Sequence, residues 1–398
     1  MFDRSFSALY FGGLLLASLM HASLPLSTVE SLDKRYAPYA DWREELIPAA
    51  FDREFVPTYW QSRDEIRLNH SSAELPLQGL HVALDPGHVG GDWAKVEGRN
   101  FKIDANDFLV REGELMLEVA QMIRTQLQDC GAQVSLLRET ARPVNFKSPL
   151  DYLQQAQSEV PPPKDYTIQA LFNYGQALQR HAQQLATIRG ELLARAKLVN
   201  EVIQPDLLIS LHMNAAVWPK ANDGAELYQL VASNHLHVLI LGCASTKEFS
   251  DKSQQRALAT KIINRSGEEE WQLAQVLARG LAKETTLPPA SYDGRNAIKV
   301  EASNSYVWAR NLLLLRMVEC PVIMLEPYVA NSRETYPRIQ AALARRVADI
   351  PLAADDILAE YSNAVVQALL THYRSPSSSV DTALEVPNDM QLPPGVSR

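Results

Sequence analysis

Short apolar runs alternate along this chain with segments of helical periodicity, and this alternation constrains the fold more than any other feature. Residues 79–84 (GLHVAL) form one such run, and residues 113–129 then carry apolar side chains at the spacing of one helical face. A continuous run such as residues 321–325 (PVIML) is typical of a strand that is covered on both faces. The alternation therefore predicts an α/β fold with a mainly parallel or mixed sheet flanked by helices.

The remaining elements are predicted from the same two patterns. Further strands are expected at residues 132–137, 206–211, 225–230 and, as a candidate additional strand, 236–241. Further helices are expected at residues 167–202, with Gly190 as a candidate break, and at 266–283 and 355–372. Three consecutive prolines at 161–163 interrupt the helical pattern before the first of these helices. Ser266 and Glu269 have the spacing of a capping box, so we expect them to begin the helix at 266.

The first residues have the composition of a secretion signal. Arg4 precedes an apolar run of 14 residues at 7–20. A membrane-spanning helix needs about 20 apolar residues, whereas the apolar part of a signal peptide is shorter. We therefore expect a signal peptide at residues 1–22, a periplasmic or secreted protein, and no stable membrane span after processing. The alternative is an N-terminal anchor that is not cleaved.

The rest of the chain divides into three regions. Residues 23–78 are polar and aromatic without a long apolar period, which predicts an N-terminal extension of short helices and loops. The α/β pattern then occupies residues 79–374 as a single domain. Residues 375–398 are rich in serine and proline and are predicted to be a disordered tail.

Charge and cysteine content exclude several classes of protein. The chain has 38 Lys and Arg residues against 47 Asp and Glu residues, a net charge of −9 at pH 7. It therefore lacks the excess of basic residues that binding to nucleic acid requires. Its three cysteines, Cys130, Cys243 and Cys320, match neither a zinc knuckle nor a disulfide framework.

Four polar residues stand where an α/β sheet binds its ligands. His88, His212 and Glu326 each follow a predicted strand, and Glu112 precedes the first long helix. Ligands bind beyond the carboxyl ends of parallel strands, so these side chains are expected at one edge of the sheet. Two histidines and a glutamate can hold Zn²⁺ with one position free for water, and a further carboxylate can take a proton from that water. The spacing fits no local motif, however, and also suits two loop histidines and a carboxylate favoured by a helix dipole.

Two other motifs are weaker. His235 and His237 have the His-x-His spacing of some metal sites, but a solvated stretch beside a strand is the favoured interpretation. Gly90 and Gly91 are not followed by the Gly-Lys-Ser/Thr sequence of a phosphate-binding loop, so a nucleotide site is rejected.

Five ordered segments within residues 79–374 resemble the zinc-dependent N-acetylmuramoyl-L-alanine amidases of the amidase 3 type. The segments are VALDPGHVGG with His88, REGELMLEVA with Glu112, CGAQVSLLR ending at Arg138, ARAKLVNEVIQPDLLISLHMNA with His212, and LLRMVECPVIMLEPYVANS with Arg316 and Glu326. Because five pieces match in the same order, the resemblance is specific. It implies a single catalytic domain with a phosphorylase/hydrolase-like α/β fold.

The resemblance also implies a reaction and the residues that perform it. Members of this family cleave the amide between N-acetylmuramic acid and the L-alanine of the peptidoglycan stem peptide. By resemblance, His88, Glu112 and His212 are the Zn²⁺ ligands, and Glu326 is the catalytic glutamate. Arg316 matches the arginine of the family and is expected to support the site. Peptidoglycan is the implied partner, and an activator protein is a further candidate.

The chain departs from the family pattern at several places. Val89 stands where the family usually has glycine, and Pro327-Tyr328 stands where it usually has Gly-Phe, so we expect a reshaped pocket rim. Residues 145–190 and 231–267 are longer than the basic fold needs. We expect the second of these segments to cover or border the zinc cleft and to limit basal activity.

Two other functions compete with the amidase interpretation. A zinc hydrolase of another cell-wall amide, either a peptidase or a deacetylase, would use the same four polar residues. A degenerate cell-wall-binding protein would bind glycan without metal, but it would not need all four of these positions.

Overall fold

A computed structural model describes residues 34–39, 58–70, 75–221, 228–301, 303–351, 353 and 355–374. The predicted signal peptide at 1–22 and the predicted tail at 375–398 lie outside these residues, as does most of the extension at 23–78. None of the helices in the described part of the chain combines the length and the apolar character of a membrane span.

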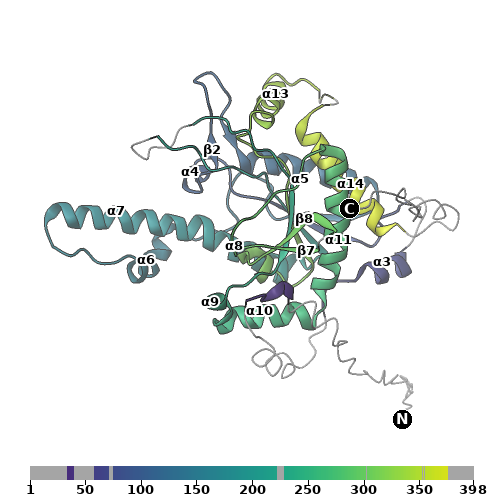
Figure 1. Cartoon of the computed structure of the whole chain (residues 1–398), viewed down its shortest axis with the longest axis horizontal. Coiled ribbons are helices and arrows are strands. Elements are labelled where there is room, and N and C mark those ends of the chain that lie inside the picture. Colours follow the sequence, from purple (N-terminus) through teal and green to yellow (C-terminus); the bar gives the residue numbers. More distant parts are fainter. Residues whose placement is uncertain are drawn as a thin grey trace, which may run out of the picture.

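A seven-stranded sheet lies at the centre of the molecule (Figure 1). In spatial order its strands are β4 (Gln133–Leu136), β1 (His81–Pro86), β5 (Leu207–Leu211), β9 (Val322–Glu326), β6 (His237–Leu241), β8 (Asn304–Arg310) and β7 (Ile298–Glu301). The first four run parallel to one another, β6 is antiparallel to β9, β8 is parallel to β6, and β7 is antiparallel to β8. The predicted α/β fold with a mainly parallel or mixed sheet is confirmed.

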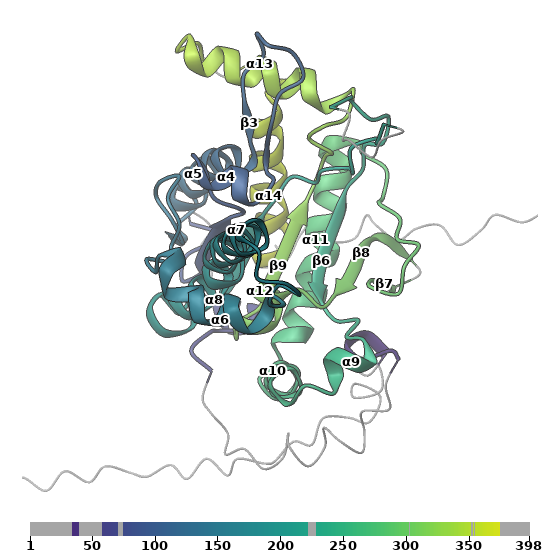
Figure 2. The ribbon, with the colours of Figure 1, turned by 90° about the vertical axis from the view of Figure 1, so that its left-hand side faces the viewer.

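Helices cover both faces of the sheet, as two perpendicular views show (Figures 1 and 2). On one face, Val82 and Leu84 of β1 belong to a core that includes α5 (Glu112–Asp129), α11 (Ser266–Thr285) and α14 (Ile357–Tyr373). On the other face, Ala83 belongs to a core that includes α8 (Glu191–Leu198), α10 (Lys252–Ile263) and α12 (Leu313–Met317). Successive residues of a strand point to opposite faces, so the inner strands are apolar throughout.

The remaining elements decorate this three-layer core. They are α3 (Arg63–His70), α4 (Trp93–Val96), the hairpin of β2 (Asn100–Phe101) and β3 (Val110–Arg111), the 3₁₀ turn η1 (Pro149–Tyr152), α6 (Leu153–Glu159), α7 (Ile168–Gln184), the π-helical segments η2 (Leu185–Gly190) and η3 (Val199–Ile203), α9 (Thr246–Phe249) and α13 (Thr335–Val347).

Helices α6 and α7 project from the sheet as a hairpin (Figure 1). The hairpin lies in the long region at 145–190 and has a small core of its own around Ala156, Ala182 and Leu185. The helical path continues from α7 through η2, α8 and η3, without the candidate break near Gly190. Gly190 instead permits close packing, because a Cβ at this position would lie 2.2 Å from the Tyr152 hydroxyl.

The predicted strand at residues 225–230 is wrong in its described part. Residues 228–230 are irregular, and residues 222–227 lie outside the described structure. The position beside β9 is taken by β6, which the sequence identified only as a candidate additional strand. The β7–β8 hairpin was not predicted.

Helix α11 begins at Ser266 without the predicted capping box. Arg265 precedes it with a φ of 61°, and Ser266 is the first helical residue, not the N-cap. A capping side chain must stand at the N-cap to reach the free N–H groups of the first turn. The Ser266 hydroxyl is instead buried without a hydrogen-bond partner among the described residues, and Glu269 accepts the N–H of Arg63.

Part of the N-terminal extension is attached to the main domain. Tyr36 is fully buried in the core beside α10. The carbonyls of Arg35 and Tyr36 accept hydrogen bonds from the N–H groups of Cys243 and Ala244, which follow β6. All three cysteines of the chain are free thiols.

Candidate active site

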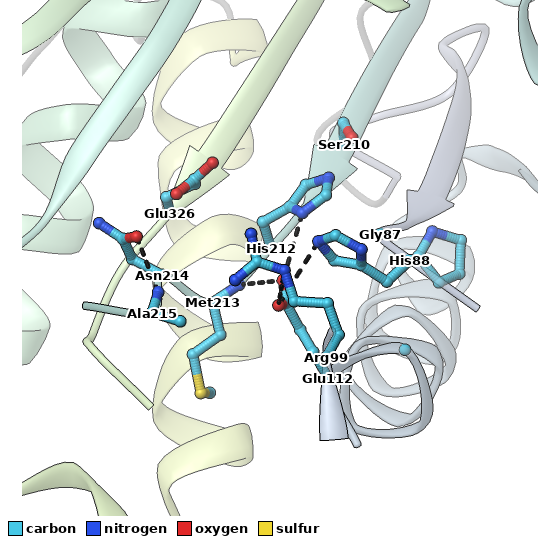
Figure 3. A network of polar contacts seen from close by, with 12 residues as sticks. Gly87, His88, Arg99, Glu112, Ser210, His212, Met213, Asn214, Ala215 and Glu326 are labelled. Carbon is cyan, nitrogen blue, oxygen red and sulfur yellow. Dashed lines mark hydrogen bonds and ion pairs between the residues drawn. The ribbon is translucent and has the colours of Figure 1, made fainter. Parts of the chain in front are cut away.

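Three of the predicted residues meet at the carboxyl edge of the sheet (Figure 3). His88 follows β1, His212 follows β5, and Glu112 begins α5. Nε2 of His88 lies 3.5 Å from Oε2 of Glu112, and Nδ1 of His212 lies 3.2 Å from Oε1. Each residue offers one ligand atom, and these atoms all lie within 4.8 Å of one another. The three side chains therefore form a candidate metal site.

The backbone at the first histidine is unusual and brings the two histidines together. His88 has a φ of 55°, in the left-handed region that non-glycine residues rarely occupy. Gly87 donates its N–H to the carbonyl of Leu211 at 2.8 Å, which ties the two histidine-bearing loops together. A Cβ on Gly87 would lie 2.5 Å from the His212 ring, so only glycine permits this approach.

A buried charge cluster behind the sheet fixes the loop of His88. Arg195 of α8 is 1 % exposed and donates to Asp85 at 2.8 Å, to Glu191 at 2.8 Å and to the carbonyl of His88 at 2.7 Å. Ser210 of β5 donates to the other oxygen of Asp85 at 2.7 Å. Buried charges are tolerated when they are paired and hydrogen-bonded in this way. Arg195 therefore joins the end of β1 to α8 and orients the loop that carries His88.

Glu97 and Arg99 belong to the site but were not predicted from the sequence. Oε1 of Glu97 lies 3.2 Å from Nδ1 of His88, and its Oε2 accepts the N–H of Val89 at 2.8 Å. A carboxylate on the far nitrogen of a histidine fixes the tautomer and orientation of a metal-binding imidazole. Arg99 lies 3.6 Å from Oε2 of Glu112. The only available signal was the acidic and basic character of a loop beside a candidate ligand, which is too common to be specific.

Glu326 ends β9 and is bonded to the neighbouring strand. Oε2 of Glu326 lies 3.0 Å from Nε2 of His237, the first residue of β6, and the two residues are partners in the antiparallel register. The side chain of Glu326 is 17 % exposed, whereas that of His237 is 4 % exposed. The sequence favoured a solvated stretch for His235 and His237, and this interpretation is wrong for His237.

The electrostatics of the site favour a cation. Burial acts to raise the pKa of Glu112, but His88, His212 and Arg99 outweigh it and lower this pKa. Burial acts to lower the pKa of His212, but the hydrogen bond and charge of Glu112 and the charge of Glu326 raise it. The carboxylates thus stay ionised and draw positive charge to this edge of the sheet.

A cavity of about 290 Å³ opens beside the candidate metal site. Glu112 lines it together with Phe101, Trp218 and Tyr228, and Lys95 and Arg99 add positive charge. The Trp218 ring lies 5.2 Å from that of Phe101 and 5.0 Å from that of Tyr228, centroid to centroid. The cavity is therefore lined by aromatic rings and also by Glu112, one of the three candidate metal ligands.

Arg316 makes no direct contact with the four site residues in the described structure. It belongs to α12, before β9 begins, so the length of that strand separates it from Glu326. Its guanidinium bonds to Asn311 at 2.5 Å and lies near Glu248, and in the described structure it has no contact with the four site residues. A supporting role for Arg316 therefore stays a prediction without a direct contact behind it in the described structure.

One part of the long segment at 231–267 borders the site, and another part lies far from it. His235 lies near Asn214, with 2.9 Å between Nε2 and Nδ2, and Figure 3 shows Asn214 beside Glu326. Helix α10 is at the opposite end of β9, because its Lys261 bonds to the carbonyl of Cys320 just before that strand begins. The segment thus borders the site around His235, whereas its helix α10 does not cover it. Residues 237–241 form an inner strand, so excising the segment would disrupt the sheet.

The family of the chain follows from a comparison of its sequence with family models. Residues 82–346 match the Amidase_3 model, which is described as N-acetylmuramoyl-L-alanine amidase. This range is more than half of the chain and includes His88, Glu112, His212 and Glu326. The chain therefore belongs to the N-acetylmuramoyl-L-alanine amidase family and is an enzyme of that class, as the resemblance implied.

Comparisons with individual proteins give only distant similarities. No curated protein matches the chain at a significant level. Among solved structures, the amidase Ami1 from Mycobacterium smegmatis has 15 % identity and a TM-score of 0.41, with 75 % of this chain and 98 % of that chain covered. AmiC2 of Nostoc punctiforme has 17 % identity and a TM-score of 0.36, with coverages of 75 % and 96 %. The CwlD amidase from Clostridioides difficile, solved in complex with the GerS lipoprotein, has 12 % identity and a TM-score of 0.38, with coverages of 74 % and 98 %.

Proposed function

We propose that this enzyme uses Zn²⁺ to hydrolyse the amide between N-acetylmuramic acid and L-alanine in peptidoglycan. The observation that carries the proposal is the convergence of His88, Glu112 and His212 at one edge of the sheet, with Glu326 at the end of the adjacent strand. Membership of the amidase family supports the same bond as the target.

The donor set suits zinc. Two imidazole nitrogens and one carboxylate are a known ligand set of catalytic zinc, which keeps a further position for water or substrate. Glu97 fixes His88 so that Nε2 is directed toward Glu112 and the shared space between them. When bound, Zn²⁺ supplies Lewis acidity, which polarises a carbonyl and makes water nucleophilic near neutral pH.

Glu326 is the proposed general base. Burial acts to raise its pKa, but the hydrogen bond and charge of His237 and the charge of His212 outweigh burial and lower it to about 2. The carboxylate is therefore ionised at neutral pH. Glu326 accepts a proton from the water that attacks the carbonyl and donates that proton to the leaving nitrogen, which restores the carboxylate.

Purified peptidoglycan distinguishes this reaction from its alternatives. The amidase should release intact stem peptides that begin with L-alanine and leave the glycan strands unbroken. Shortened peptides would favour a peptidase, released acetate a deacetylase, and glycan binding without metal or products a degenerate cell-wall binder. Mass spectrometry of the soluble products, with metal analysis of the same sample, separates these outcomes.

The aromatic cavity is the proposed binding place for the part of the substrate next to the scissile amide. We expect Trp218→Ala to raise KM by about 2- to 12-fold, because an aromatic contact contributes about 0.5–1.5 kcal/mol and 1.4 kcal/mol corresponds to tenfold. Zinc content should not change, since Trp218 is not a ligand candidate. Tyr166→Ala, at an exposed aromatic residue that does not line the cavity, is the matched control. An unchanged KM for Trp218→Ala in steady-state assays would remove the cavity from substrate binding.

Export remains part of the proposal, because peptidoglycan lies outside the cytoplasm. We expect the protein to be periplasmic or secreted and its signal to be cleaved after residue 22. N-terminal sequencing of protein recovered from the cell envelope should begin near Ser23. Full-length protein confined to the cytoplasm would contradict this prediction. An activator protein stays a prediction.

A further inference from the structure

The carboxylate of Glu326 is held by a chain of polar groups that the reaction described above does not use, and His237, the first of them, is buried. Nε2 of His237 lies 3.0 Å from Oε2 of Glu326, and the Tyr292 hydroxyl lies 3.3 Å from Nδ1 of the same imidazole. Tyr292 in turn packs against Trp308 at 4.9 Å between ring centroids and lies under the guanidinium of Arg310 at 5.4 Å. His237 is thus fixed at both ring nitrogens.

The direction of the hydrogen bonds follows from the chemistry of the groups. A carboxylate can only accept, so Nε2 of His237 carries the proton and donates it to Glu326. Burial raises the pKa of Tyr292, which therefore stays protonated and can donate to Nδ1. We assign the Nε2–H tautomer to the neutral imidazole from these partners, and a protonated imidazole would donate to Glu326 in the same way.

This bond engages only one oxygen of the carboxylate. Within the part of the chain that the structure describes, Oε2 of Glu326 is bonded to His237, and Oε1 has no hydrogen-bond partner. The side-chain torsion next to a carboxylate is soft, so an unbonded carboxylate would rotate among several orientations. A bond on Oε2 from a buried imidazole with a partner at each ring nitrogen restricts that rotation and leaves Oε1 free to accept a proton.

We propose that His237 is a positioning residue for the reaction, whose Nε2–H fixes the carboxylate of Glu326 in a single orientation. The inference rests on the proposed role of Glu326 as base. The sheet itself supplies the geometry, because β6 is antiparallel to β9 and its first residue pairs with the last residue of β9. A third group that orients a catalytic base is a recurring arrangement in enzymes.

Other charged and titratable groups around Glu326 also influence the pH dependence of the reaction. Those that face it are His212 after β5, Arg99 before β2, His235 before β6, Tyr292 before β7, and Tyr361 of α14. A His237 variant leaves all of these groups in place. A change in the pH profile that is specific to such a variant therefore reports on the His237–Glu326 bond.

Two substitutions at one position test the proposal. His237→Leu removes the donor, and His237→Gln retains an N–H donor at a similar reach from the same backbone position. We expect His237→Leu to lower kcat by about 10- to 100-fold, as the loss of a supporting partner does at metal centres, with KM and zinc content unchanged. The acid limb of its kcat–pH profile should move to higher pH, because burial then raises the pKa of Glu326 without the opposing hydrogen bond. His237→Gln should recover most of the rate.

Parent-like kcat and an unmoved acid limb in a folded His237→Leu protein would overturn the inference. Equal losses in the Leu and Gln variants would also overturn it, because they would mean that only the packing of the imidazole matters. If the parent enzyme itself released no stem peptides, the proposed function would fail instead.

A measurement that needs no substrate distinguishes failure of the His237 inference from failure of the proposed function. Carbon-13 NMR of labelled glutamate, with Glu326 identified by the signal lost in Glu326→Gln, should show a low pKa in the parent and a higher pKa in His237→Leu. An identical titration of Glu326 in both proteins would overturn the inference, whatever the activity of the parent.

Discussion

His88→Ala and His212→Ala are each expected to lose both bound zinc and amidase activity. Losing an outer partner of a metal ligand commonly costs about 10- to 100-fold in metal affinity, so losing one of three direct ligands should cost more. Glu112→Ala should behave in the same way, since Glu112 contacts both imidazoles. Zinc measured by inductively coupled plasma mass spectrometry, together with release of stem peptides, checks this expectation.

His181→Ala provides the matched control for these variants. His181 lies on α7 and pairs with Glu159 on the projecting hairpin, away from the site. It should retain both zinc and activity. If His88→Ala or His212→Ala kept close to one zinc per chain and a normal rate, the proposed metal site would be wrong.

Glu326→Gln is expected to keep its zinc and to lose about 10²- to 10⁴-fold in kcat. The amide preserves the shape of the carboxylate but cannot accept the proton of the attacking water, and general acid–base assistance is worth about this factor. Because Glu326 is not among the three ligand candidates, metal content should stay near one per chain. Glu284→Gln, at an exposed position on α11, is the control for removing one negative charge.

Two results would contradict this assignment in different ways. Hydrolysis of peptidoglycan by Glu326→Gln at the parent rate would exclude Glu326 as the base, even with a correct zinc site. Loss of zinc from Glu326→Ala would instead make Glu326 a further ligand, and the base would have to be another residue around the cavity.

The convergence of His88, His212 and Glu326 could be expected from the sequence, because the order of the strands brings their carboxyl ends together. His88, His212 and Glu326 each follow an apolar strand, and parallel strands present their carboxyl ends at one edge. Glu112 was identified because it precedes the first long helix, and α5 does begin at that residue. The positions of residues at strand ends can be predicted from the order of the strands, without the paths of the loops.

Residues whose contacts depend on loop paths could not be predicted. Glu97 directly follows α4 and reaches His88 through the path of the intervening loop, which no periodicity in the sequence reports. His237 was missed because an apolar run does not reveal the direction of its strand. Had β6 run parallel to β9, its last residue, and not its first, would lie beside Glu326. Arg316 was named from the family match alone, and the described structure shows no contact between it and the four site residues.

The buried charge cluster around Arg195 connects the projecting α6–α7 hairpin to the loop that carries His88. Glu191 accepts the N–H groups of Val144 and Asn145 where the hairpin leaves the sheet, and it also accepts Nε of Arg195. Arg195 in turn holds the carbonyl of His88. Buried hydrogen bonds through Glu191 and Arg195 therefore link the root of the hairpin to the loop of His88. A force that tilts the hairpin at its root must displace His88 or break a buried, charged hydrogen bond.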